Sequence, residues 1–365
     1  MFSVMQARAP GRVNSPRRVL TPVLGISVPR RRAEELREEL ASVRLVDKSR
    51  AILERGDRIL IPLLSAPRPG FAEEFGAEIV EMEFPERNAP KIHPIESIRT
   101  SARIPANLKQ AIPDKWELLG DVVIVRLGKE LEPYLREIGE AYAGVLKAKS
   151  VLREVGAITG EFREPSTELL FGVDTETIHV ENHVRFKLDA ARTMFSSGNE
   201  EERLRMATMP CDGETVIDMF AGIGYFSIPL AVYQKPKEII ACELNPVAHR
   251  YLSENVALNR VERVVRPRLG DNRDLPGESI ADRILMGYVK TTHEFLPTAV
   301  RLVKSGGIIH YHETCPNELL PDRPVERLRA AVPKGKVEVL RSKDIKSYAP
   351  GVSHVVVDAR ILKPS

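Results

Sequence analysis

Close cysteine pairs and long apolar runs are both missing from this sequence. Its three cysteines, Cys211, Cys242 and Cys315, lie too far apart for a zinc site or a disulfide framework. This pattern suits a reducing compartment, so we expect a cytoplasmic protein. No stretch approaches about 18 uninterrupted apolar residues, which excludes a membrane-spanning helix. Val19–Val28 is interrupted by Pro22 and lacks the apolar block of a signal peptide.

Acidic residues are missing from the first 33 positions, although these hold seven arginines. The net charge of the whole chain is only +3, so basic charge is concentrated at this end. Such a segment can neutralise phosphates, and a purely solvated tail is the alternative. We expect a flexible basic tail over residues 1–20. Arg30–Arg32 stands at an expected helix start and should form a folded basic patch.

The length of 365 residues favours two or three domains over one. Hydrophobic residues make up 43% of the chain and charged residues 29%, which is ordinary for a globular protein. Strand and helix periodicity outlines a small α+β unit over residues 21–84, whose thin core suits an appended recognition domain. We expect a proline-rich linker with one short helix over 85–113 and a second α+β module over 114–184.

Residues 185–365 alternate strands with helices. This alternation predicts an α/β domain with a doubly wound, Rossmann-like sheet of predominantly parallel strands. Helices are expected at 226–232 and 246–259. Strands are expected at residues 215–218, 238–243, 264–269, 281–286, 307–312 and 353–361.

A dinucleotide fingerprint is missing from the first strand-to-helix turn of this domain. The turn reads Asp218-Met-Phe-Ala-Gly222-Ile-Gly224-Tyr-Phe226, and Ser227 replaces the third glycine of G-x-G-x-x-G. Gly222 and Gly224 still let the backbone approach a ligand where a Cβ would collide. The glycine pair alone is weak evidence, so the neighbouring strand ends decide the interpretation.

Polar residues end the next strands in the order that a nucleoside-binding sheet needs. Glu243 ends a strand 25 residues after Asp218, where a carboxylate accepts hydrogen bonds from both ribose hydroxyls. Asp271 and Asn272 end the third strand, where they can read an adenine edge. Because such sheets bind ligands at their carboxyl edge, we expect a cofactor site here, formed by Asp218, Gly222, Gly224, Glu243, Asp271 and Asn272. The alternative is a set of ordinary turn and cap residues, with Asn272 the clearest candidate.

The loop after the fourth strand lacks the residues typical of amino-methylating enzymes. Those enzymes place an asparagine or aspartate followed by prolines at this strand end, and the loop backbone grips the target nitrogen. Here the loop reads Gly287-Tyr288-Val289. This departure indicates a different chemistry.

Four segments carry a resemblance to a known family. They are the stretch from Phe186-Lys187-Leu188-Asp189 to Arg203, the turn Asp218–Phe226, the pair Asp282-Arg283, and His293–Leu296. They resemble the tRNA (guanine-37 N1)-methyltransferase superfamily, and the resemblance spans essentially the whole chain from about residue 21. It implies a class I methyltransferase-like sheet preceded by two small α+β modules.

Within that superfamily the chain is most similar to the wybutosine-synthesising aminocarboxypropyltransferase branch. The branch markers are Met-Phe-Ser-Ser-Gly-Asn at 194–199, Gly-Asp-Asn-Arg at 270–273, Met-Gly-Tyr at 286–288 and His-Tyr-His-Glu at 310–313. The methyltransferase branch would show a proline and an arginine near 197–199 and Asn-Leu-Pro at 287–289. This chain has neither.

The resemblance implies a defined reaction. The 3-amino-3-carboxypropyl group of S-adenosyl-L-methionine would move to C7 of 4-demethylwyosine at position 37 of tRNA-Phe, and methylthioadenosine would leave. The sulfonium has three carbons open to attack, so the orientation of the cofactor sets the product. The implied partner is tRNA-Phe, held by the first module, with no metal and no membrane. The sequence is silent on oligomeric state.

The resemblance also carries cofactor contacts onto individual positions. These are Ser196, Arg203, Glu243, Asp271 and Asn272. Arg203 offers a fork of donors suited to the methionine carboxylate, and an ion pair with Glu200 or Glu201 is the alternative.

Catalytic candidates lie on a helix and at the end of the fifth strand. Glu202 is a candidate base for the C7 proton, with a solvated helix carboxylate as the alternative. His310, His312 and Glu313 are expected on the substrate side, with a structural role as the alternative. His310-x-His312 lacks further partners, so no metal site is expected.

Two other functions stay open. A methyltransferase acting on guanosine 37 would release S-adenosylhomocysteine instead of methylthioadenosine. A tRNA-binding module without catalysis belongs to a different class, and the complete cofactor set argues against it.

Overall fold

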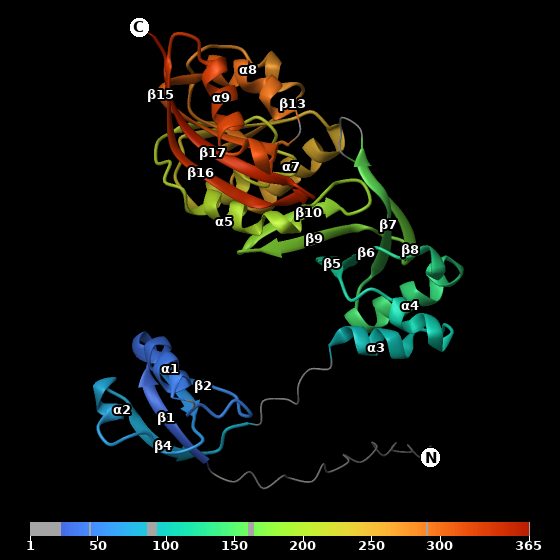
Figure 1. The fold of residues 1–365 in the computed structure, drawn as a ribbon, viewed down its shortest axis with the longest axis vertical. Helices are drawn as coiled ribbons and strands as arrows, with labels where there is room; N and C mark the ends of the chain where they lie inside the picture. The colour runs from blue at the N-terminus through green and yellow to red at the C-terminus, as the bar shows by residue number, and fades with distance from the viewer. Residues whose placement is uncertain (1–22, 44, 86–92, 160–163, 290, 365) are drawn as a thin grey trace, which may run out of the picture. The chain divides into compact units, whose positions relative to one another are not determined.

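The computed structural model describes residues 23–43, 45–85, 93–159, 164–289 and 291–364. They fall into two compact units, residues 1–92 and 93–365. The expected basic tail over residues 1–20 lies outside the described residues. Figure 1 shows the helices and strands of both units.

The first unit is an antiparallel sheet with strand order β2-β3-β1-β4 and an amphipathic helix, α1. Leu36 and Leu40 lie one helical turn apart on α1 and are fully buried in one core with Ile26 and Val28 of β1. The arginines before α1 form a short 3₁₀ turn. The elements are β1 (Val23–Pro29), the turn (Arg30–Arg32), α1 (Ala33–Ser42), β2 (Leu53–Arg55), β3 (Arg58–Pro62), α2 (Phe71–Glu74) and β4 (Glu78–Met82).

The second unit begins with a four-stranded sheet, β5-β6-β7-β8, packed against α4. The structure differs from the expected linker over residues 93–113. Ile98 of α3 and Ile112 are buried in the same core as Tyr142 of α4. Residues 93–113 are therefore a folded segment, despite their prolines. The elements are α3 (Pro94–Ser101), β5 (Trp116–Leu119), β6 (Val122–Val125), α4 (Leu135–Leu146), β7 (Ser150–Thr159) and β8 (Glu164–Phe171), with 3₁₀ turns at Ala106–Ala111 and Lys129–Tyr134.

The large sheet has strand order β13-β12-β11-β14-β15-β17-β16. The five strands from β13 to β15 run parallel to their neighbours, and β17 and β16 add antiparallel pairs. The predicted doubly wound, mostly parallel sheet is therefore confirmed, with β16 as an unpredicted strand. The strands are β11 (Thr215–Asp218), β12 (Glu238–Glu243), β13 (Val265–Leu269), β14 (Ala281–Met286), β15 (Val303–Pro316), β16 (Lys336–Ala349) and β17 (Val352–Leu362).

Helices cover both faces of this sheet, each with its own core. One core joins α5, α6 and α7 to the sheet, and the other joins α8 and α9. The chain runs outward from β11 to β13 and then returns to β14 on the other side of β11, so the strand order switches there. A crevice at such a switch point is where these folds bind ligands. The helices are α5 (Glu200–Thr208), α6 (Ser227–Tyr233), α7 (Pro246–Leu258), α8 (Leu296–Leu302) and α9 (Asp322–Ala331).

A two-stranded hairpin of β9 (Glu176–Glu181) and β10 (Val184–Asp189) precedes α5. The expected boundary between residues 184 and 185 falls at its second strand. Asn255 of α7 holds β10, because its side chain accepts from the backbone N–H of Lys187 at 2.6 Å and donates to the Lys187 carbonyl at 3.0 Å. The hairpin is thereby fixed to the helix layer of the large sheet.

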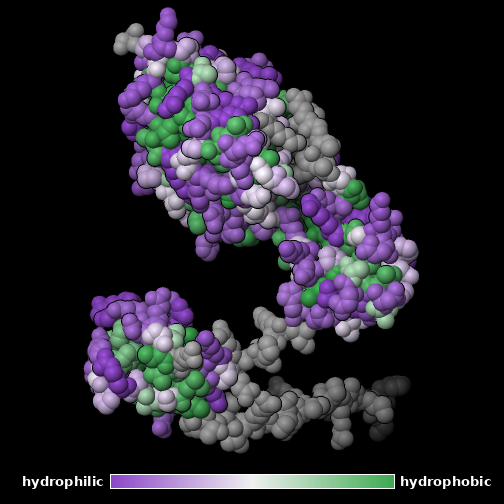
Figure 2. All heavy atoms as spheres, viewed as in Figure 1, coloured by the Kyte–Doolittle hydropathy of each residue, from purple (hydrophilic) through white to green (hydrophobic). Residues whose placement is uncertain are grey.

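Hydrophilic and hydrophobic residues both contribute to the surface of the described residues (Figure 2). Figure 2 shows hydrophilic residues spread over the visible faces of both units. Among the described residues, no helix has the length and apolar character needed to cross a membrane.

Candidate functional site

A cavity of about 780 Å³ opens at the carboxyl ends of β11 to β14, at the switch point of the sheet. Six of the eight residues predicted to bind a cofactor line it. They are Ser196, Arg203, Gly222, Glu243, Asp271 and Asn272. Segments far apart in the sequence thus meet at one edge of the sheet.

The glycine turn after β11 has the backbone geometry that its sequence predicts. Gly222 and Gly224 have φ angles of 57° and 102°, the left-handed region that side chains disfavour. A Cβ on Gly224 would lie 2.4 Å from Cδ1 of Ile228. Gly222 forms part of the cavity wall, whereas Gly224 lets the turn pack against α6.

Asp218 does not line the cavity, in contrast to its predicted contact with the cofactor. Its carboxylate accepts from the Ser227 hydroxyl at 2.6 Å and from the Phe220 backbone N–H at 3.2 Å. It is fully buried, and burial raises its pKa to about 6. Asp218 therefore acts on the site indirectly, by holding both ends of the glycine turn.

Glu243 is fixed at the end of β12 by two backbone donors. Oε2 accepts from the N–H of Gly222 at 2.7 Å, and Oε1 accepts from the N–H of Asn245 at 2.8 Å. Burial raises the pKa of this carboxyl. A carboxylate offers about four acceptor positions, so two backbone contacts orient it and leave capacity for two hydroxyl donors in the cavity.

Asn272 presents an acceptor that the protein does not satisfy. Its Nδ2 donates to the Met219 carbonyl at 2.8 Å, which fixes the amide. Its Oδ1 is buried and makes no hydrogen bond to any described residue. Leaving such an atom without a partner costs about 1–3 kcal/mol, so it marks a position for a ligand donor. Beside it, the Arg273 guanidinium lowers the pKa of Asp271.

The side-chain contacts of Arg203 differ from those predicted. Its guanidinium makes two hydrogen bonds of 2.6 Å to the Glu181 carboxylate and one of 2.7 Å to the Ser196 carbonyl. The partner is thus Glu181 of β9 rather than Glu200 or Glu201. Glu181 therefore occupies the guanidinium donors of Arg203 that were expected to bind the methionine carboxylate. Arg203 still lines the cavity.

The neighbourhood of Ser196 supplies polar groups that the sequence analysis did not single out as ligands. Lys346 of β16 donates to the Ser196 hydroxyl at 3.2 Å, and both residues line the cavity. Asn199 also lines it, with a buried Oδ1 that makes no hydrogen bond to a described residue. A cation and an unsatisfied acceptor in the wall of one cavity suit a ligand that carries a carboxylate and an ammonium. Asn199 belonged to a recognised motif, whereas no local signal marked Lys346.

An aromatic group forms another part of the wall. The rings of Phe220 and Tyr288 stack with centroids 5.0 Å apart, and Phe295 meets Phe220 edge-on at 4.9 Å. All three line the cavity, and Arg273 lies over the Phe295 ring at 5.0 Å. Such rings can stack on a planar base. The sequence analysis noted Tyr288 and Phe295 only as motif members.

His310, His312 and Glu313 do not converge on the cavity, which corrects the expected substrate-side cluster. Successive side chains of a strand point to opposite faces, so both histidines face α5 and Glu313 faces α9. Glu313 is fully buried and ion-paired with Arg327 and Arg323, the latter at 2.6 Å. None of the three lines the cavity.

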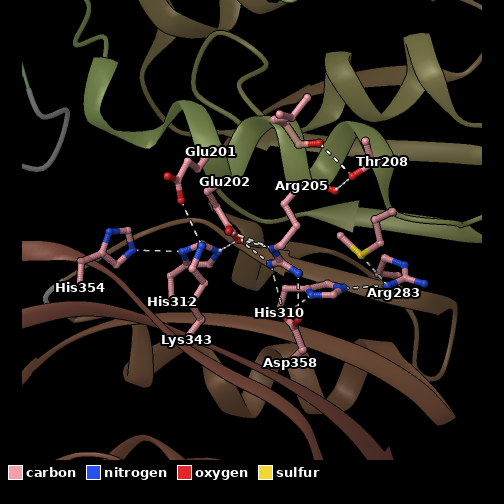
Figure 3. A network of polar contacts seen from close by, with 12 residues as sticks. Glu201, Glu202, Arg205, Thr208, Arg283, His310, His312, Lys343, His354 and Asp358 are labelled. Carbon is pink, nitrogen blue, oxygen red and sulfur yellow. Dashed lines mark hydrogen bonds and ion pairs between the residues drawn. The ribbon is translucent and has the colours of Figure 1, made fainter. Parts of the chain in front are cut away.

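Glu202 is also buried, rather than solvated, and only 2% of its surface is exposed. It is ion-paired with Arg205, which also contacts Asp358 of β17 at 2.8 Å. Asp358 in turn lies 2.5 Å from Nδ1 of His310. Figure 3 shows this network between α5 and the sheet. Glu202 is therefore part of a buried charge network and not a side chain of the cavity wall.

Ionisation in this network follows from its contacts. Arg283 lies 2.8 Å from Nε2 of His310 and can only donate, so Nε2 accepts and Nδ1 carries the hydrogen that faces Asp358. Burial raises the pKa of Asp358, but the contacts with His310 and Arg205 outweigh it and hold the pKa at about 2. Burial lowers the pKa of His310. The result is a neutral imidazole that links two charged side chains.

A metal centre has no candidate in the described part of the chain. Among those residues, no group of three or more His, Cys, Asp or Glu side chains is placed to hold an ion. The three cysteines are buried and unpaired.

Family models match three successive segments of the chain. The TRM5/TYW2 methyltransferase domain matches residues 177–340, and the TYW2 N-terminal domain matches residues 98–175. The tRNA methyltransferase 5 N-terminal domain matches residues 25–72, within the first unit.

Curated relatives carry two related names. A tRNA(Phe) (4-demethylwyosine(37)-C(7)) aminocarboxypropyltransferase from Pyrococcus horikoshii is 50% identical over 265 residues, which are 72% of this chain and 95% of the relative. A tRNA (guanine(37)-N(1))-methyltransferase, Trm5b from Pyrococcus abyssi, is 37% identical over 342 residues, which are 93% of this chain and 99% of the relative.

Similar solved structures include two that carry the name TYW2. P. horikoshii TYW2 in complex with MeSAdo is 47% identical, with a TM-score of 0.68 over 74% of this chain and 100% of that chain. M. jannaschii TYW2 in complex with AdoMet is 42% identical, with a TM-score of 0.57 over 68% of this chain and 100% of that chain.

Proposed function

The chain belongs to the TRM5/TYW2 methyltransferase family, and from this membership we propose that it is a tRNA(Phe) (4-demethylwyosine(37)-C(7)) aminocarboxypropyltransferase. It transfers the 3-amino-3-carboxypropyl group of S-adenosylmethionine to C7 of 4-demethylwyosine at position 37 of tRNA-Phe. Relatives of that name are 50% and 49% identical to it, and it covers 95% and 97% of their lengths.

The cavity has groups that fit S-adenosylmethionine. Glu243 is oriented to accept from two ribose hydroxyls, and Oδ1 of Asn272 needs a donor such as the adenine amino group. Lys346, Ser196 and Asn199 suit the carboxylate and ammonium of the methionine end, with Arg203 beside them. When bound, the cofactor supplies a carbon activated by its positively charged sulfur. The protein residues bind and orient it.

The loop after β14 favours the aminocarboxypropyl reaction over methyl transfer. A Cβ on Gly287 would lie 2.5 Å from Cε2 of Phe226. Asparagine at this position, as methyltransferases have it, would therefore require the Phe226 ring to move. That ring stacks on His312 with centroids 5.6 Å apart, within the buried core. This glycine is the observation that carries the choice between the two reactions.

The products distinguish the two reactions directly. We expect the chain, S-adenosylmethionine and tRNA-Phe carrying 4-demethylwyosine to yield methylthioadenosine and a nucleoside heavier by the aminocarboxypropyl group. Mass analysis of digested tRNA checks this. A methylated nucleoside with S-adenosylhomocysteine would instead identify a guanosine-37 methyltransferase, a reading that the Trm5-type first unit supports.

We also propose that the first unit binds the tRNA backbone. Its exposed Arg30 forms an ion pair with Glu54, and Arg32 pairs with Glu35, so acids partly neutralise the arginine cluster. Replacing Arg30, Arg31 and Arg32 by glutamine should weaken tRNA binding and flatten its salt dependence, by about 0.9 in log–log slope per lost phosphate contact. Binding across a salt series measures this. An unchanged slope would assign the cluster to a structural role.

A further inference from the structure

The phenylalanine and tyrosine rings of the cavity wall differ in whether they pack against another ring of the protein. Those with such a neighbour are Phe220, Tyr225, Phe226, Tyr288 and Phe295. Tyr348 of β16 also lines the cavity, and 43% of its surface is exposed. Its side chain makes no ring contact and no hydrogen bond with a described residue. An exposed aromatic ring in a cavity wall is a surface on which a planar ligand can stack.

A β-bulge brings Tyr348 to the cavity. Residues 346–348 all line it, although neighbouring side chains of a regular strand point to opposite faces. Ser347 and Ala349 are two residues apart but pair with adjacent residues of β17, so Tyr348 is the additional residue of the bulge. Bulges change the direction of a side chain and are common beside active sites. The irregular end of β16 therefore adds an aromatic ring to the cavity wall.

The strand order places Tyr348 away from the adenosine end of the cavity. Glu243 and Asn272 follow from β12 and β13 at one side of the sheet, whereas β16 is the last strand at the other side. Lys346, two residues before Tyr348, donates to the Ser196 hydroxyl at 3.2 Å, in the part of the wall that suits the methionine end. The group to be transferred belongs to the methionine end. A planar ligand beside it is the base that receives this group.

Resting on the proposed function, we propose that Tyr348 stacks on the base at position 37 of the tRNA and holds it beside the methionine end of the cofactor. C7 is an atom of that base, so the base has to leave the stack of its neighbouring nucleotides to enter the cavity. Leaving the stack costs free energy, and stacking on an aromatic side chain of the enzyme offsets part of this cost. Tyr348 is thus a substrate-binding residue.

Two substitutions separate the ring from the hydroxyl. Tyr348→Ala removes both, and we expect it to weaken binding of tRNA-Phe carrying 4-demethylwyosine by about 5- to 150-fold, the range that base–aromatic stacking provides. Tyr348→Phe keeps the ring and should bind within about twofold of the wild type. Filter binding in the presence of methylthioadenosine measures both affinities without turnover. Because Tyr348 is exposed, the midpoint of urea denaturation should not change in either variant.

A tRNA-Phe that lacks the base at position 37 completes a double-mutant cycle. With this tRNA, Tyr348→Ala and the wild type should bind equally, because the ring has lost its partner. Calorimetry should give the same S-adenosylmethionine affinity for both proteins. Tyr233→Ala is the matched control, since Tyr233 on α6 is 44% exposed but lies outside the cavity. It should bind both tRNAs as the wild type does.

Four results would overturn the assignment. They are equal affinities of Tyr348→Ala and the wild type for the modified tRNA, a loss that persists with the tRNA lacking the base, equal losses in Tyr348→Phe and Tyr348→Ala, and a parallel loss of S-adenosylmethionine affinity. Absence of methylthioadenosine formation by the wild type would instead refute the proposed reaction. The binding cycle needs no turnover, so a failure of the stacking contact is distinguishable from a failure of the proposed function.

Discussion

Polar side chains lie both on the face of β15 that contacts α9, called its far face below, and at the carboxyl edge of the parallel strands. The two groups differ in where their hydrogen-bond partners lie. On the far face, Glu313 accepts a hydrogen bond from Tyr311 and forms ion pairs with Arg323 and Arg327. In the cavity at the strand edge, Oδ1 of Asn272 and Oδ1 of Asn199, which precedes α5, have no hydrogen-bond partner among the described residues. A buried polar atom that lacks a protein partner therefore marks the strand edge, and not the far face of β15, as a ligand site.

The two regions also use charge differently. The Glu313 cluster ties β15 to α9 and contributes to the stability of that face. At the strand edge, Glu243 is oriented by backbone N–H groups, which keeps it available to a ligand. The inner face of β15 carries His312 and the charge network of Glu202. We expect its charged groups to be intermediate between the Glu313 cluster and the strand edge. Three substitutions measure the difference.

The largest effect is expected at the closed cluster. Glu313→Ala leaves Arg323 and Arg327 without their buried partner and should lower the free energy of unfolding by about 3–5 kcal/mol. Urea denaturation measures this loss, and affinity for S-adenosylmethionine should not change. Glu338→Ala is the control, because its ion pair with Lys336 is exposed and contributes less than about 1 kcal/mol. A stable Glu313→Ala protein with weakened cofactor binding would reverse the comparison.

An intermediate effect is expected at the strand edge. Glu243→Ala should weaken S-adenosylmethionine binding by about 1–3 kcal/mol, because two ribose hydroxyls lose their acceptor. Calorimetric titration gives the affinity. Glu254→Ala on α7 is the control, since Glu254 contacts Lys187 outside the cavity. Equal affinities for wild type and Glu243→Ala would remove Glu243 from the site.

The smallest effect concerns the pH dependence of stability on the inner face. His312 has a folded pKa of about 3, below the ordinary value of 6.5, so the unfolded chain binds more protons below pH 6.5. Its contribution to stability is complete above that pH and declines as the pH falls, by about 1–2 kcal/mol between pH 7 and pH 5. Asp218 acts in the opposite direction, because its pKa is raised to about 6.

The difference between wild type and His312→Gln isolates this contribution, since Asp218 titrates in both proteins. Denaturation at a series of pH values should give a shallower loss of stability for the variant. Identical pH dependences in the two proteins would mean that the pKa of His312 does not differ between the folded and unfolded states.

Local patterns in the sequence were enough to predict the parallel half of the large sheet. Alternating strands and the glycine turn both depend on residues close together in the chain. β16 was missed because its 14 residues include many exposed polar ones and lack a clear alternation. Residues 93–113 were misread because five prolines between 85 and 113 suggested a linker, whereas burial of the intervening isoleucines depends on distant α4.

Spacing in the sequence predicts the cavity wall best where a strand end supplies one contact. Glu243, Asp271 and Asn272 were found because the carboxyl edge of a parallel sheet is a known place for ligands. Arg203 was predicted from the family resemblance to bind the methionine carboxylate. Its ion pair with Glu181 could not be predicted, because Glu181 lies on a hairpin 22 residues away. Lys346 and His354 reach the cavity from an antiparallel addition to the sheet, and no spacing in the sequence predicts that reach.

The position of β17 between β15 and β16 has a consequence for synthesis on the ribosome. β15 ends at Pro316, but β17 begins only at Val352, so β15 leaves the exit tunnel well before its antiparallel neighbour. At about 5–20 residues per second, the nascent chain exposes this hydrophobic strand edge for a few seconds. His354, which lies near the start of β17, completes the cavity wall only after that interval. Slow translation of residues 317–352 would lengthen the period in which the growing chain can aggregate.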